Sequence, residues 1–213
     1  LLVKETQDEQ LIRLAYEYLP LTFGRRHGDP SRPWNHYEIN VRDDEGNRLL
    51  GYQGNWRDIF QNWEALALSY PKFIGSFMTK FVNASTVDGY NPYRITKEGI
   101  DWEMLEPENP WSNIGYWGDH QIIYLLKLLE LADKYQSSEL VAWLNEEHFS
   151  YANVPYEIVG AEQIFKNPKD TVTFNTEKQQ VIDERCEKLG SDGRLVMGAS
   201  DNAVSYTHLT LPT

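Results

Sequence analysis

The chain has 213 residues, a formal net charge of -12 and a single cysteine, Cys186. The acidic balance argues against nucleic acid or an anionic membrane as a partner, because either would require a basic surface. No apolar run approaches the roughly 20 residues of a membrane span. One cysteine allows no internal disulfide and weakly favours a reducing compartment, so we expect a cytoplasmic location.

The first quarter of the chain predicts one helix and one β-hairpin. The helix runs from about Thr6 to Tyr18 and stops before Pro20. Its predicted buried side consists of Leu11, Leu14, Ala15 and Tyr18. The hairpin covers about 37–53, with a turn at 43–47, where the sequence is Asp-Asp-Glu-Gly-Asn.

The next stretch predicts a helical hairpin. One helix follows Trp56 and ends near Tyr70, and a second helix begins after Pro71. The predicted buried faces consist of Ile59, Trp63, Leu66, Ala67 and Tyr70 on the first helix and of Phe73, Ile74, Phe77, Met78, Phe81 and Val82 on the second. The segment from Asn83 to Gly118 has little periodicity and predicts a long loop, which in a compact domain is usually either functional or a misassigned element.

The segment from Trp111 to Leu131 combines a polar, aromatic loop with a leucine-rich helix. The predicted buried stripe of this helix consists of Ile122, Leu125, Leu126 and Leu129, with Lys127 and Glu130 opposite. Asp119 stands at the N-cap position, where its carboxylate faces unpaired N–H groups. Asp119 and His120 are candidate site residues, and capping alone and a structural histidine are equally good interpretations.

Three further elements are predicted after this helix. Ser138 to Asn145 forms a helix, and Thr176 to Leu189 forms a charged, capped helix ended by Gly190. The sequence from Gly193 to Met197 predicts a short strand. The chain is therefore predicted to be mainly α, with helical hairpins joined by long loops.

The densest polar cluster at a helix start consists of Arg57, Asp58 and Gln61. A guanidinium, a carboxylate and an amide together suit sugar hydroxyls, which both donate and accept hydrogen bonds. An Arg–Asp surface pair that contributes little is an equally good interpretation. Metal binding is not predicted, because the histidines and carboxylates lack ligand spacing, and no cofactor motif is present.

The tryptophans divide by position. Trp63 and Trp143 lie within predicted helices, where core packing is favoured. The predicted loops carry Trp34, Trp102, Trp111 and Trp117. Their rings could cover the apolar faces of sugars, although packing beneath the loops is slightly favoured for any one of them.

The order of these motifs resembles the six-hairpin glycosidases, and the cellobiose-phosphorylase-like branch most closely. The similar stretches are Trp56-Arg57-Asp58-Ile59-Phe60-Gln61, Tyr70-Pro71, Asp88-Gly89-Tyr90, Gly118-Asp119-His120-Gln121 and the segment from Phe149 to Tyr156. The resemblance covers about 52–156. Asp101-Trp102-Glu103 is similar to the motif of the family's general acid but lies upstream of its expected place, so we do not assign a catalytic residue.

The resemblance implies an α/α toroid, incomplete over residues 1–203, with the hairpin at 37–53 inserted before the central helices. It implies a fragment of a carbohydrate-active enzyme, an inverting glycoside hydrolase or phosphorylase, that is inactive alone because the catalytic acid lies further downstream. The substrate would be an oligosaccharide or disaccharide, with phosphate in a phosphorylase. The alternative is a non-catalytic sugar-binding or scaffold protein on the same fold.

The implied substrate-binding residues come from two helix starts that open at the same rim. They are Arg57, Asp58, Gln61, Tyr116, Trp117, Asp119 and His120. Arg57 and Asp119 would face one pocket, with Trp117 as a wall. Residues 204–213 resemble a translated sequencing adapter and are expected to be a non-native tail.

Overall fold

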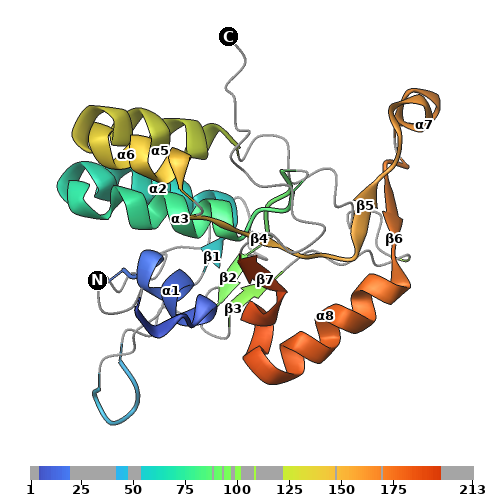
Figure 1. Ribbon diagram of the computed structural model, residues 1–213, viewed down its shortest axis with the longest axis horizontal. Coiled ribbons are helices and arrows are strands. Elements are labelled where there is room, and N and C mark those ends of the chain that lie inside the picture. Colours follow the sequence, from blue (N-terminus) through green and yellow to red (C-terminus); the bar gives the residue numbers. More distant parts are fainter. Residues whose placement is uncertain are drawn as a thin grey trace.

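The computed structural model describes residues 5–19, 42–47, 54–87, 89–92, 94–96, 99–101, 108, 122–146, 148–168 and 170–197. This part of the chain is mainly helical (Figure 1). Its helices are α1 (Glu9–Tyr16), α2 (Trp56–Ser69), α3 (Ile74–Asn83), α5 (Ile122–Tyr135), α6 (Ser137–Asn145), α7 (Ala161–Lys166) and α8 (Thr176–Leu189), with short 3₁₀ turns η2 (Pro71–Phe73) and η3 (Gly190–Arg194).

The core lies between two helical hairpins, α2–α3 and α5–α6. The predicted break at Pro71 is confirmed, since η2 separates α2 from α3 there. Aromatic rings join the two helices: the Phe60 and Phe81 centroids are 4.7 Å apart, and those of Trp63 and Phe77 are 5.0 Å apart. Because the higher-numbered ring pairs with the lower-numbered one, α2 and α3 run antiparallel. Most of the predicted buried residues of both helices are confirmed, but Tyr70 is half exposed.

The two hairpins have the same direction in the layer. The backbone N–H of Ser150, shortly after α6, donates to Asn83 Oδ1 at the end of α3, so α3 and α6 finish at the same end. Their partners α2 and α5 therefore both begin at that end of the layer, and β1 (Gly54–Asn55) directly precedes α2 there (Figure 1). Between the hairpins, Lys127 Nζ lies 2.8 Å from Glu64 Oε2.

Short antiparallel strands lie toward one end of the helical layer (Figure 1). One sheet has the order β1-β2-β3, with β2 (Arg94–Thr96) paired to β3 (Gly99–Asp101) so that Ile95 faces Ile100. These strands correct the prediction of an irregular loop from Asn83 to Gly118. The predicted turn at 43–47 is confirmed, since Asp43 Oδ1 accepts from the backbone N–H groups of Glu45 and Asn47. The predicted strands at 37–41 and 48–53 lie outside the described residues.

The C-terminal part returns to the layer through a strand pair. β4 (Ser150–Ala152) pairs with β7 (Leu195–Met197), which confirms the short strand predicted after Gly193. The helix α8 has an Asn175 cap and ends at Gly190, where φ is +67°, as predicted. Between them, β5 (Tyr156–Ile158), α7 and β6 (Val172–Phe174) form an arm that projects from the layer (Figure 1).

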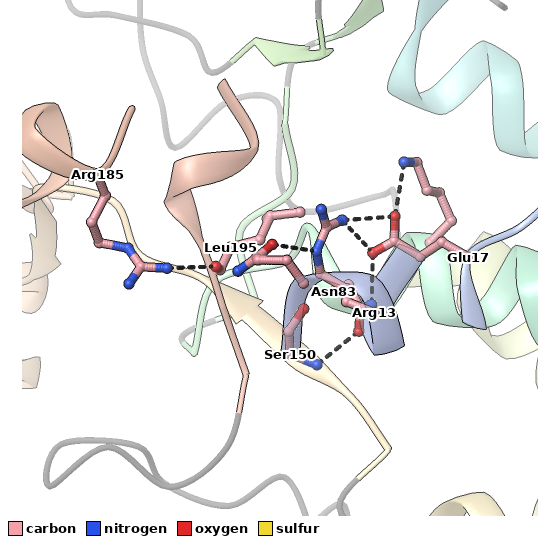
Figure 2. A network of polar contacts seen from close by, with 8 residues as sticks. Arg13, Glu17, Asn83, Ser150, Arg185 and Leu195 are labelled. Atoms are coloured by element: carbon pink, nitrogen blue, oxygen red, sulfur yellow. Dashed lines mark hydrogen bonds and ion pairs between the residues drawn. The ribbon is translucent and has the colours of Figure 1, made fainter. Parts of the chain in front are cut away.

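The predicted buried side of α1 is wrong. Leu11, Leu14 and Tyr18 are 42%, 47% and 63% exposed, whereas Arg13 and Glu17 are 1% and 5% exposed. Glu17 is held by three donors, since its carboxylate accepts from Arg13 Nη1, Lys80 Nζ and Asn83 Nδ2 at 2.7–3.0 Å (Figure 2). A buried carboxylate is stable only with such partners, so α1 packs on α3 through charge.

The predicted stripe on α5 is also partly wrong. Leu125 is buried as expected, but Ile122 and Leu126 are 53% and 48% exposed. The buried positions next to Leu125 are instead Leu128 and Ala132. The core therefore uses a face of α5 that is rotated from the predicted one.

Candidate functional site

The polar cluster predicted from the sequence lies in the first turns of α2. β1 ends at Asn55 and α2 begins at Trp56, so this helix start is tied to the sheet by the pairing of β1 with β2. Asp58 stands in the first turn, where the helix dipole stabilises a carboxylate. Its side chain is 9% exposed, whereas that of Arg57 is 25% exposed.

The cluster consists of a long ion pair between Arg57 and Asp58 and the exposed amide of Gln61. Arg57 Nε lies 3.7 Å from Asp58 Oδ1, which is too long for a hydrogen bond. Gln61, one turn later, is exposed. The three groups can thus present donors and acceptors to a polyol from one helix end, although the ion pair itself adds little stability.

Trp56 belongs to the core and does not form a wall of this site. The ring is 0% exposed, with its centroid 4.7 Å from that of Phe60 and 5.7 Å from that of Phe81. Trp63 is likewise buried, as predicted, and Trp143 is partly buried against the core. The α2 start is therefore anchored by an apolar residue immediately before its polar ones.

The remaining predicted site residues lie outside the described residues. They are Tyr116, Trp117, Asp119 and His120, together with Trp34, Trp102 and Trp111. The helix that they precede, α5, begins at the same end of the layer as α2. The described structure thus brings the two helix starts to one end, while the proximity of Arg57 and Asp119 stays a prediction.

A cavity away from this cluster was not predicted from the sequence. A cavity of about 290 Å³ lies between α1, α3 and α6. Its lining consists of Ala15, Tyr16, Lys72, Gly75, Ser76, Thr79, Glu139, Ala142, Trp143, Glu146 and His148. These residues come from three well-separated parts of the chain, so no local sequence motif predicts the cavity. The only local signal is Gly75 inside a helix, where glycine is unfavourable and usually has a packing reason.

Two classes of site are absent from the described part of the chain. No group of three or more histidine, cysteine or carboxylate side chains there could hold a metal ion. Among the same residues, no helix has the length and apolar character needed to cross a bilayer.

Comparison with known proteins adds no assignment to this geometry. No protein-family model matches the chain, and no curated protein matches it either.

Proposed function

We propose that this chain is part of a carbohydrate-active enzyme, an inverting glycoside hydrolase or phosphorylase, built on an α/α toroid. Arg57, Asp58 and Gln61 bind hydroxyls of an oligosaccharide or disaccharide. Residues 116–120, before α5, complete the same pocket. The chain supplies sugar-binding groups, and the catalytic acid is not among the residues assigned.

The observation that carries the proposal is the common origin of α2 and α5. Two antiparallel helical hairpins lie side by side with their first helices starting at one end. In a toroid of such hairpins, the starts of alternate helices gather at one rim, and the long connections lie there too. Arg57 and Asp58 stand in the first turn of α2, at that end.

The chemistry of the pair favours a neutral polyol over a charged ligand. The charges of a carboxylate and a guanidinium side by side largely cancel each other at a distance, and both groups form directional hydrogen bonds. Gln61 adds a neutral donor and acceptor. Vicinal hydroxyls, each of which donates and accepts, match this set.

Saturation-transfer NMR on the chain, with a panel of disaccharides, tests the proposal. We expect transfer to at least one sugar, and Arg57→Ala should weaken that sugar's affinity about tenfold, because a charge-assisted hydrogen bond is lost. Lys134→Ala is the matched control, since Lys134 is an exposed cation near the opposite end of α5.

Absence of transfer to every sugar, or transfer that Arg57→Ala leaves unchanged, would refute the assignment of this site. Repeating the titration with phosphate separates the enzyme classes, because a phosphorylase binds both substrates in one pocket.

A further inference from the structure

The cavity between α1, α3 and α6 has an ordered arrangement of chemical groups. Its floor includes the buried residues Gly75, Thr79 and His148. Its half-buried walls include the rings of Tyr16 and Trp143. Its exposed rim carries charges of both signs on Lys72, Glu139 and Glu146. No residue of α2 or α5 contributes, so this cavity is separate from the proposed sugar site.

The polar atoms that Thr79 and His148 bring to the floor are paired with each other. The Thr79 hydroxyl lies 2.7 Å from the carbonyl oxygen of Gly75 and donates its only proton there. His148 Nε2 lies 3.0 Å from the same hydroxyl, so Nε2 must carry a proton and donate it to Thr79 Oγ1. An apolar group that covers this pair leaves no hydrogen bond broken, so the floor accepts hydrocarbon without a desolvation penalty from these atoms.

Three rings surround the same floor. The centroid of His148 lies 4.1 Å from that of Tyr16 and 5.8 Å from that of Trp143. The indole of Trp143 rests directly on α3, because a Cβ atom at Gly75 would lie 2.5 Å from Trp143 Cη2. Glycine at this position therefore sets the depth of the ring. Aromatic walls of this kind bind a flat or branched apolar group.

The rim carries cationic and anionic side chains, which together could bind the two charges of a zwitterion. Lys72 lies in η2, before α3, and Glu139 lies in the first turn of α6. Within the part of the chain that the structure describes, no ion pair joins Lys72 to Glu139. Glu139 Oε2 accepts from Ser138 Oγ at 2.8 Å, which leaves Oε1 for a ligand. An ammonium could thus be bound at Glu139 and a carboxylate at Lys72.

We propose that this cavity binds a free α-amino acid with a large apolar side chain. The side chain lies over the surface formed by the rings of Tyr16, Trp143 and His148, which contact one another, and the ammonium and carboxylate stay at the rim. The volume, about 290 Å³, equals the share of about ten water molecules. The apolar side chain of leucine or phenylalanine needs only part of this volume, which lies just below the usual range of about 300–1,000 Å³ for small-molecule pockets.

The floor sets a further condition on the ligand. The Thr79 hydroxyl and His148 Nε2 are paired with each other, so a carboxylate on the ligand side chain would lose its hydration there without gaining a partner from this pair. Aspartate and glutamate should bind more weakly than leucine or phenylalanine.

Isothermal titration of the chain with L-phenylalanine tests the proposal, with phenethylamine and 3-phenylpropionate as ligands that each lack one charge. We expect phenylalanine to bind at least about threefold more tightly than either analogue, the ratio that an exposed ion pair can give. Lys72→Gln should weaken phenylalanine and leave phenethylamine unchanged, and Glu139→Gln should weaken phenylalanine and leave 3-phenylpropionate unchanged. Both substitutions are on exposed side chains, so folding is not at risk.

The controls are Lys188→Gln and Glu187→Gln, which remove one charge of each sign from exposed positions of α8. Gly75→Ala gives a separate measurement, because the added methyl displaces Trp143 and should weaken all three ligands together. Equal binding of phenethylamine and phenylalanine would overturn the proposal in favour of a simple cation site. Binding of disaccharides alone, binding that the rim variants do not alter, or no binding at millimolar phenylalanine would also overturn it.

Discussion

The two sides of α3 are held by different physical means. On the side of α2, Phe77 and Phe81 pack against Phe60 and Trp63 in a cluster of buried rings. On the side of α1, Lys80 and Asn83 bind the buried carboxylate of Glu17. The groups at both interfaces are largely buried, yet one interface is apolar and the other is ionic.

The comparison shows what each kind of interface specifies. Ring packing is close but tolerates small shifts, because dispersion and burial have no strict direction. The ionic side has directional requirements, since Asn83 donates to Glu17 and accepts from the Ser150 N–H at the same time. Asn83 thereby fixes α1 and β4 relative to one another, whereas the rings supply most of the favourable free energy of burial.

Removing a ring should give the largest loss of stability. Trp63 is 1% exposed and contacts Phe60 and Phe77, so Trp63→Ala leaves a cavity and should lower the free energy of unfolding by about 3–5 kcal/mol. Urea denaturation followed by circular dichroism measures this change. Leu68→Ala, at a position of the same helix that is 55% exposed, is the control and should change it by less than about 0.5 kcal/mol. Similar losses in the two variants would show that the ring cluster is not the main apolar contact.

Removing the carboxylate from the ionic side should lower the free energy of unfolding slightly less. Replacing its partners as well should restore most of that loss. Glu17→Leu leaves Arg13 and Lys80 without their shared carboxylate and should lower the free energy of unfolding by about 3 kcal/mol. The triple variant Arg13→Met/Glu17→Leu/Lys80→Met should recover most of this loss, because buried ion pairs can be replaced by apolar groups. Comparison of the urea denaturation midpoints of the single and the triple variant measures this recovery.

A triple variant as unstable as Glu17→Leu would mean that the charges contribute directly and are not merely mutually compensating. If the triple variant is stable but its amide resonances near Ser150 are broadened, the network specifies position more than stability. That outcome would sharpen the contrast with the ring cluster.

The smallest effect is expected from the half-exposed ion pair between α2 and α5. Lys127 Nζ donates to Glu64 Oε2 at 2.8 Å, and this hydrogen bond raises the pKa of Lys127 above its ordinary value. A raised pKa of a base stabilises the fold below the unfolded-state pKa, about 10.4 for lysine, and the stabilisation is lost as pH rises through the folded-state pKa. Lys127→Met should therefore lower Tm by about 2 °C or less at pH 7, and the difference should shrink at pH above 10.4. A difference that grows with alkaline pH would contradict the assignment.

The sequence predicted the apolar side of α3 well and the ionic side not at all. The α2–α3 hairpin was predictable because apolar residues recur at helical spacing on both sides of Pro71. The α1 interface was not, since Arg13 and Glu17 look like solvent-facing charges until Lys80 and Asn83 arrive from more than 60 positions away. An analysis of periodicity treats apolar residues as buried and charged residues as exposed. It cannot recognise a charged side chain that is buried because distant residues bind it.

The structure differs from the prediction at α5 and at the strands β2 and β3 as well, and there too local sequence is not sufficient. The first two turns of α5 are almost uniformly apolar, so many faces could be buried, and its neighbours α2 and α3 select Leu125, Leu128 and Ala132. The strands β2 and β3 have three residues each, too few for alternation to be detected. For the candidate site, the sequence located Arg57 and Asp58 at a helix start, because a polar cluster and the onset of helical periodicity are both local signals. The cavity lined by Tyr16, Trp143 and His148 depends on tertiary contacts alone.

The dependence of Glu17 on distant donors has a consequence during synthesis. Lys80 Nζ and Glu17 Oε2 belong to residues 63 positions apart. At 5–20 residues per second, the ribosome needs roughly 3 to 13 seconds to extend the chain from one to the other. Until then α1 has only its own Arg13 to neutralise the carboxylate, and a helix of eight residues is marginal in water. The N-terminal segment is therefore synthesised several seconds before it can pack on α3. During that time the charges on its later buried face keep it hydrated.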